Sequence, residues 1–169
     1  MDNAAQDEWL VTHIPHRIRA ALAGLPLQVE LLKTLAVAEP HKIEHRSAGN
    51  AVWEGRLAAI RWLIEFIGVK EDKDGKPAPV NPKGVDCSIR MIEGGVPFDL
   101  QSPDASVLAR VWRGCSQASS HATHKSGHPP VGELQLDQAM RIIAAHLDRT
   151  IYANHARKVA AASLHLENR

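Results

Sequence analysis

The longest helical pattern in the chain covers residues 41–69, and it constrains the fold more than any other segment. Apolar residues recur there at intervals of three and four, as they do on one face of an α-helix. A second row of apolar residues makes this face so broad that we expect the helix to be buried on more than one side. The two rows comprise Ala48, Val52, Ala59, Leu63, Phe66 and Ile67, and Trp53, Leu57, Ile60 and Ile64. The pattern therefore predicts a central helix that Gly68 ends.

Two helices are predicted before this central one. In residues 6–23 apolar side chains repeat every four positions. Pro15 lies inside that pattern, so we expect the helix either to start or to kink there. Residues 27–38 predict a short second helix, which Pro40 ends. The N-terminal part of the chain is thus expected to be helical.

The central helix is followed by an insert of different composition. Residues 70–84 are charged and rich in proline and glycine, which is typical of an exposed loop. Within residues 85–102, the segment 85–92 fits either a short strand or one helical turn, and we expect Phe98 and Leu100 to lie against the core. We therefore predict an irregular insert over about residues 70–102.

The last predicted helix spans about residues 136–164. Its inward stripe comprises Leu136, Met140, Ile143, Leu147 and Ile151. Beyond Tyr152 the pattern weakens into alanine, so residues 156–169 predict either a helical extension or a frayed tail. With a further helix over residues 107–124, the chain predicts a single domain over residues 1–169. Its fold class is all-α: an up-and-down bundle of four or five helices, with the insert between helices three and four.

The charges of the chain nearly cancel, with a formal net charge of +1 over 169 residues. Such a balance gives no general attraction to nucleic acid or to membranes, so either kind of binding requires a local patch. Two widely separated cysteines, Cys87 and Cys115, indicate a reduced intracellular protein. The acidic N-terminus lacks a signal-peptide pattern, and no apolar run approaches the length of a membrane span. We therefore expect a cytoplasmic protein with no membrane partner.

Arginine and histidine gather on one face of the helix predicted over residues 107–124. Apolar residues there recur at spacings of three and four, and polar residues follow the same spacing two positions later, which puts them roughly on the opposite face. Asp104 is the expected N-cap of this helix. The two faces comprise Leu108, Val111, Cys115, Ala118 and Ala122, and Arg110, Arg113, Gln117, His121 and His124. The helix is therefore expected to display guanidinium and imidazole groups outward and to keep the Cys115 thiol buried and inert.

The ten histidines of the chain raise a metal-binding interpretation. His121, His124 and His128 are spaced three and four apart, so an unbroken helix would bring them to one face. His41 and His45 fit the H-x-x-E-H pattern of inverted zincins. Short patterns arise by chance in a histidine-rich chain, so no cofactor is expected. A histidine-based metal-binding bundle stays an alternative.

A second interpretation concerns phosphate chemistry on RNA. Arg113 and His121 lie two helical turns apart, roughly 12 Å of rise. Arginine can neutralise a phosphate, and histidine can take the proton of an attacking 2′-hydroxyl, so these two are the candidate catalytic residues. The candidate substrate-binding residues are Arg110, Gln117, Ser120 and His124. Two copies of this polar helix face, brought together across a two-fold axis, could form a composite cleft.

Three segments, in this order, resemble the HEPN-like helical domains of bacteria. They are HIPHRIRAALAGL, EHRSAGNAVWEGRLAAIRWLIEFIG and VWRGCSQASSHATH, the last followed by the final long helix. The similarity covers about residues 8–155. It implies an all-α bundle that is frequently a homodimer. In active members it implies a metal-independent endoribonuclease that uses arginine and histidine, of the toxin–antitoxin or phage-defence type.

This chain departs from the family's catalytic signature at two points. Seven residues separate Arg113 from His121, which is more than in the family pattern, and the residue after Arg113 is Gly114 instead of a polar residue. Two functions therefore stay open beside the RNase. One is a non-catalytic bundle that binds RNA or a cognate protein partner, and the other is the metal-binding bundle.

Overall fold

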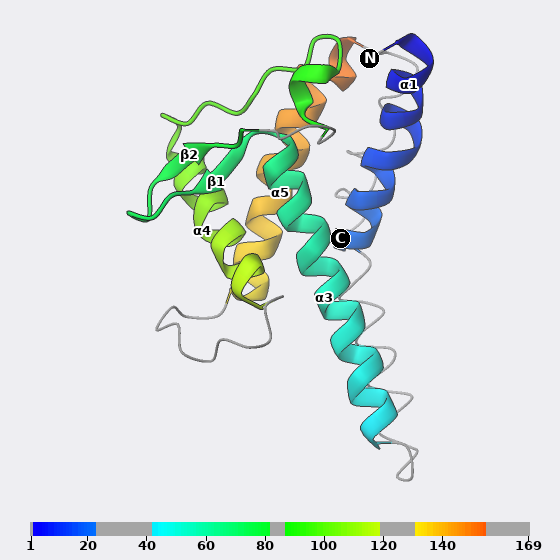
Figure 1. Ribbon diagram of the computed structural model, residues 1–169, viewed down its shortest axis with the longest axis vertical. Coiled ribbons are helices and arrows are strands. Elements are labelled where there is room, and N and C mark those ends of the chain that lie inside the picture. The colour runs from blue at the N-terminus through cyan, green and yellow to red at the C-terminus, as the bar shows by residue number, and fades with distance from the viewer. Residues whose placement is uncertain (1, 23–41, 82–86, 119–130, 155–169) are drawn as a thin grey trace.

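The computed structural model describes residues 2–22, 42–81, 87–118 and 131–154 (Figure 1). Its longest element is helix α3 (Lys42–Phe66), whose first turns extend beyond the other described elements. Helices α4 and α5 and strand β1 all pack against the remaining turns. The central helix predicted from the sequence is therefore confirmed. Its end is confirmed as well, because Gly68 has a φ of 93° and donates its N–H to the carbonyl of Glu65 at 3.0 Å.

The N-terminal helix passes through Pro15 without ending. It comprises helix α1 (Asn3–Glu8), a π-helical turn (Trp9–His13) and further α-helix over residues 14–22. In the π turn the N–H of Ile14 bonds to the carbonyl of Trp9, five residues back. A π turn widens the helix just before a residue that has no N–H to donate, which accommodates Pro15. The predicted start at Pro15 is therefore wrong, because the helix begins before this residue and continues through it.

Helices α4 (Pro103–Ala118) and α5 (Glu133–Thr150) complete the described bundle. The predicted inward residues of both helices that have described side chains are buried. Helix α4 begins one residue before the predicted cap Asp104. The Ser102 side chain accepts the N–H of Asp104 at 3.3 Å, so Ser102 takes the capping role. Helix α5 is shorter than predicted and is followed by a 3₁₀ turn (Tyr152–Asn154).

The side chain of Tyr152 links this 3₁₀ turn to the N-terminal helix. Its hydroxyl donates a hydrogen bond to the carbonyl of Leu10 at 3.1 Å, and the side chain is buried. Burial raises the pKa of Tyr152 far above its ordinary value. The hydrogen bond of Tyr152 thus connects the 3₁₀ turn after α5 to the N-terminal helix.

Part of the predicted exposed loop, residues 70–84, is a β-hairpin. Strands β1 (Val69–Glu71) and β2 (Pro77–Pro79) pair antiparallel, with Val69 opposite Pro79. The Asp72 carboxylate holds the turn by accepting the N–H groups of Asp74 and Lys76. The hydrogen bond from Lys76 is the main reason that the pKa of Asp72 lies below its ordinary value. Both prolines lie in an edge strand, where the missing N–H costs least.

The second half of the insert follows the prediction more closely. It contains a 3₁₀ turn (Ile89–Met91), and Phe98 is buried while Leu100 is half-buried. The carbonyl of Val96 accepts a hydrogen bond from Nε2 of buried His146 on α5 at 2.7 Å. Burial lowers the pKa of His146, and the hydrogen bond to the carbonyl of Val96 opposes this shift only in part.

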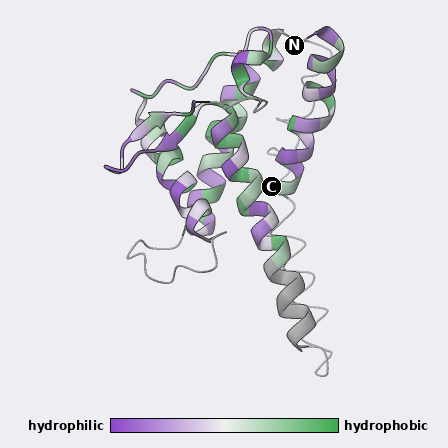
Figure 2. Cartoon of the chain, in the orientation of Figure 1, coloured by the Kyte–Doolittle hydropathy of each residue, from purple (hydrophilic) through white to green (hydrophobic). Residues whose placement is uncertain are grey.

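Taken together, the described residues form an all-α bundle with an insert after the central helix, as predicted. Figure 2 shows hydrophobic and hydrophilic residues alternating along the helices, and hydrophilic residues at the hairpin. No described helix is long and apolar enough to cross a membrane. The predictions for residues 27–38 and 156–169 lie outside the described residues.

Candidate functional site

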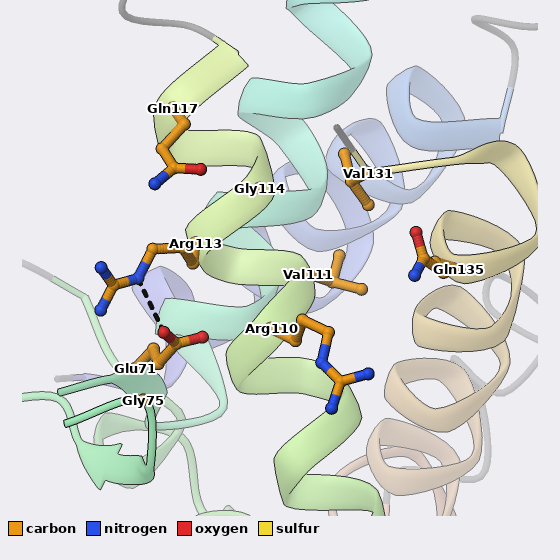
Figure 3. A pocket seen from close by; sticks show the side chains of 9 residues that line it. All are labelled: Glu71, Gly75, Arg110, Val111, Arg113, Gly114, Gln117, Val131 and Gln135. Carbon is orange, nitrogen blue, oxygen red and sulfur yellow. Dashed lines mark ion pairs between the residues drawn. The ribbon is translucent and has the colours of Figure 1, made fainter. Parts of the chain in front are cut away.

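Three of the predicted site residues line one pocket beside helix α4. The pocket has a volume of about 330 Å³ and lies between the hairpin, α4 and the start of α5 (Figure 3). Its lining comprises Glu71, Gly75, Arg110, Val111, Arg113, Gly114, Gln117, Val131 and Gln135. Helical spacing explains the gathering, because positions 110, 113 and 117 follow one another at intervals of three and four. The polar face predicted for this helix therefore borders a cavity, as far as the described residues of α4 extend.

Arg113 is held by the hairpin. Its Nε lies 2.8 Å from Oε1 of Glu71, and its Nη2 donates to the carbonyl of Asp72 at 2.6 Å. The side chain of Glu71 is 10% exposed and that of Arg113 is 27% exposed, so water reaches the pair only in part. The sequence predicted a guanidinium displayed for a ligand. In the structure the chain's own carboxylate already contacts it.

Arg110 is placed differently from Arg113. Figure 3 shows the two guanidinium groups pointing to opposite sides of α4, Arg113 toward the hairpin and Arg110 toward the side of α5. Arg110 is exposed, and no described residue forms an ion pair with it. Its charge is therefore available to an anion that enters the pocket.

Two glutamines add amide groups to the pocket lining. Gln117 is half-buried on α4. Gln135 lies in the first turn of α5, where its side-chain oxygen accepts the N–H of Gly132 at 2.8 Å. This bond leaves the amino group of Gln135 as a donor. The pocket therefore combines guanidinium and amide donors with apolar walls at Val111 and Val131, a donor set that suits phosphate or carboxylate oxygens.

Gly114 on α4 lies close to Val131, which comes just before α5. A Cβ atom at position 114 would lie 2.7 Å from Cβ of Val131. A larger residue would therefore push Val131 away. Packing therefore accounts for a glycine at position 114.

Replacing Gly114 with alanine is expected to lower the free energy of unfolding by about 1–3 kcal/mol, because the Cβ of Val131 cannot swing aside as a flexible side-chain end can. Gly55 on α3 is the matched control, since a Cβ there meets nothing within 4 Å. Gly55→Ala should instead stabilise the helix, by roughly 0.5–1 kcal/mol. Urea unfolding of both variants gives the comparison. Equal effects of the two substitutions would contradict the packing explanation.

Cys115 lies on the buried face of α4, as predicted. Its side chain is fully buried, and burial raises the pKa of the thiol to about 12. Cys87, which is half-buried, has its pKa raised to about 11 for the same reason. Both groups remain thiols at neutral pH, so neither is suited to act as a nucleophile.

Most of the remaining predicted site residues are histidines in other segments of the chain. Ser120, His121, His124, His128 and His41 lie outside the described residues. Within the ranges that the structure describes, no three histidine, cysteine, aspartate or glutamate side chains gather as a metal site. The catalytic pairing of Arg113 with His121 and the histidine metal sites stay predictions.

Glu71 is the site residue that the sequence reasoning missed. The charged stretch around it was assigned to an exposed loop, whereas strand pairing carries Glu71 to the side of α4. One signal was present, since Asp74-Gly75 is a frequent hairpin turn. The contact with Arg113 itself joins positions far apart in the chain, and no local pattern predicts it.

Comparison with protein-family models, with curated proteins and with solved structures finds no match to this chain.

Proposed function

We propose that this chain is a HEPN-like helical-bundle protein that forms a homodimer and binds RNA through the polar face of α4. The observation that carries the proposal is that Arg110, Arg113 and Gln117 all line one pocket. Arginine binds phosphate oxygens through its planar set of N–H donors, and amides add hydrogen bonds to sugar or base. The homodimer and the family assignment come from the sequence resemblance.

A local positive patch is what RNA binding requires in a chain whose net charge is only +1. The pocket lining holds two arginines and one glutamate, so it carries an excess of positive charge. Arg110 is the exposed member of this set, and we assign it the first contact with a phosphate group.

The ion pair between Glu71 and Arg113 favours a binding role over a catalytic one. A guanidinium that neutralises a carboxylate is less available to stabilise the charge that develops during phosphodiester cleavage. We therefore place RNA binding first. Endoribonuclease activity of Arg113 with His121, assisted by Ser120 and His124, is the second form of the proposal, in which a phosphate displaces Glu71 from Arg113.

Replacing Arg110 with alanine is expected to weaken binding of a short single-stranded RNA about tenfold at low salt, because one phosphate contact is lost. Fluorescence anisotropy with a labelled RNA of mixed sequence measures the effect. Arg141 is the matched control: it is an exposed arginine on α5 that does not line the pocket. Arg141→Ala should change the affinity less than twofold. An equal loss in both variants, or no RNA binding by the unchanged protein, would contradict the proposal.

Incubation with RNA in EDTA separates the binding protein from the nuclease. RNA cleavage that disappears in both Arg113→Ala and His121→Ala assigns the metal-independent RNase. RNA binding without cleavage assigns the non-catalytic protein. Native mass spectrometry of the same samples tests the homodimer, and metal analysis of untagged protein tests the histidine-based alternative.

A further inference from the structure

The position of Glu71 is fixed by the hairpin. Val69, two residues before it, is fully buried, and β1 is paired with β2 along its length. The N–H of Val80 also bonds to the carbonyl of Gly68 at 3.1 Å, which closes the base of the hairpin. The carboxylate is therefore presented to α4 from a strand anchored in the core.

The contact between Glu71 and Arg113 is a charge contact more than an aligned hydrogen bond. The two charged atoms, Oε1 and Nε, lie 2.8 Å apart, yet Nε is buried and makes no well-directed hydrogen bond. Nη2 is used by the carbonyl of Asp72. A guanidinium has five N–H donors, so Arg113 keeps donors for a further oxygen atom without leaving Glu71.

The charge of the pocket depends on the same carboxylate. The three charged residues of the lining are Arg110, Arg113 and Glu71, so the lining has one net positive charge. A group with one negative charge neutralises it. A group with two negative charges leaves its second charge without a counter-charge in a place that is only partly exposed to water, and the cost of removing that charge from water disfavours binding.

We propose that Glu71 positions Arg113 and makes the pocket select a singly charged phosphodiester over a doubly charged phosphate monoester. This inference rests on the proposed RNA binding and names the kind of phosphate that the site accepts. An internal phosphate of an RNA chain has the required single charge, whereas a terminal phosphate has nearly two above its second pKa of about 6. The site is thereby directed to the interior of an RNA strand.

Competition binding tests the selectivity. A labelled single-stranded RNA is displaced either by adenylyl-adenosine, which has one phosphodiester, or by adenosine 5′-monophosphate. At a pH well above 6, the dinucleotide should displace the labelled RNA from the unchanged protein at a lower concentration than the monophosphate does. Glu71→Gln should raise the affinity for RNA and shift the ratio of the two inhibition constants about tenfold toward the monophosphate, because one negative charge is removed from the lining.

Two further variants make the result specific. Asp104→Asn removes a carboxylate from the exposed first turn of α4, outside the pocket, and should leave the ratio unchanged. Glu71→Asp keeps the charge and should keep the preference for the dinucleotide. If Glu71→Gln does not fold, Arg113→Gln gives the opposite test, since removing a positive charge should increase the preference for the dinucleotide.

The outcomes separate this inference from the proposed function. Failure of the unchanged protein to bind RNA overturns both. Normal RNA binding with a ratio that does not change in Glu71→Gln overturns the role of Glu71 alone. A loss of thermal stability in Glu71→Gln with an unchanged ratio assigns Glu71 a purely structural role and also overturns the inference.

Discussion

Replacing Arg56 with methionine is expected to lower the free energy of unfolding by about 3 kcal/mol. The side chain of Arg56 on α3 is fully buried, and it joins three segments. Its Nε donates to the carbonyl of Ala21 at 2.8 Å, Nη2 contacts Asp137 at 3.2 Å, and Nη1 forms an ion pair with Glu133. Methionine fills part of the space but leaves two carboxylates and a carbonyl without their donor. Because both carboxylates are 38% exposed, water compensates in part, which keeps the loss near the lower end for a buried pair.

Arg61 provides the matched control for Arg56. It lies on the same helix, pairs with Glu65 at 3.0 Å four residues on, and is 41% exposed. Such an exposed pair contributes about 0–1 kcal/mol, so Arg61→Met should lose at most that amount. Urea unfolding followed by circular dichroism measures both variants. If Arg56→Met loses no more than Arg61→Met, the buried arginine does not join the three segments as described.

Replacing Gly95 with alanine is expected to have an effect of similar size, about 3 kcal/mol. A Cβ at this position would lie 1.9 Å from the carbonyl oxygen of Ile89 and 2.9 Å from that of Ile92. Both obstacles are backbone atoms, so no side-chain rotation relieves them. The turn must open, which moves the neighbouring Val96 away from His146 and disturbs the contact of Phe98 with the same ring, at 5.0 Å between centroids.

Thermal unfolding and hydrogen exchange measure the effect of Gly95→Ala. The amide of Phe98, which bonds to the carbonyl of Ile67 at 2.9 Å, should lose protection more than amides of α3. Gly75→Ala is the control, because that glycine has a positive φ of 79° but nothing closer than 3.9 Å to its Cβ position. It should cost only about 1–2 kcal/mol of backbone strain. A smaller loss in Gly95→Ala than in Gly75→Ala would contradict the crowding argument.

The helices were predictable because their signals are local. The stripe of Leu136, Met140 and Ile143 repeats within a few residues, and each of these side chains is buried in α5. The breadth of the apolar face on α3 likewise predicted its central position, and Gly68 predicted its end. In each case the hydrophobic period specifies both the helix and the face that it buries.

The prediction was wrong where the structure depends on pairing between distant residues. Strands of three residues have too few positions to show a period of two, and Pro77 and Pro79 argued against a strand. The helix that was expected to start or kink at Pro15 continues through this residue, with a π turn just before it. The burial of Arg56 was not predictable either, because its partners lie 77 and 81 positions away in the sequence and no local pattern indicates them.

The candidate site was predictable only in part. Helical spacing predicted that Arg110, Arg113 and Gln117 follow one another along α4, and all three line one pocket. The spacing could not predict Glu71, because its contact with Arg113 depends on the hairpin. The same contact changes the expected role of Arg113 from a free phosphate ligand to one half of an ion pair beside the exposed Arg110.

The salt dependence of RNA affinity tests the central claim most directly. For single strands, the slope of log affinity against log salt concentration changes by about 0.7 for each phosphate that the protein contacts. The affinity of the unchanged protein should therefore fall with salt more steeply than that of the Arg110→Ala/Arg113→Ala double variant, by a slope difference of about 0.7, because the pocket accepts one phosphodiester. Equal slopes for the two proteins would contradict the assignment of the α4 pocket as the RNA-binding site.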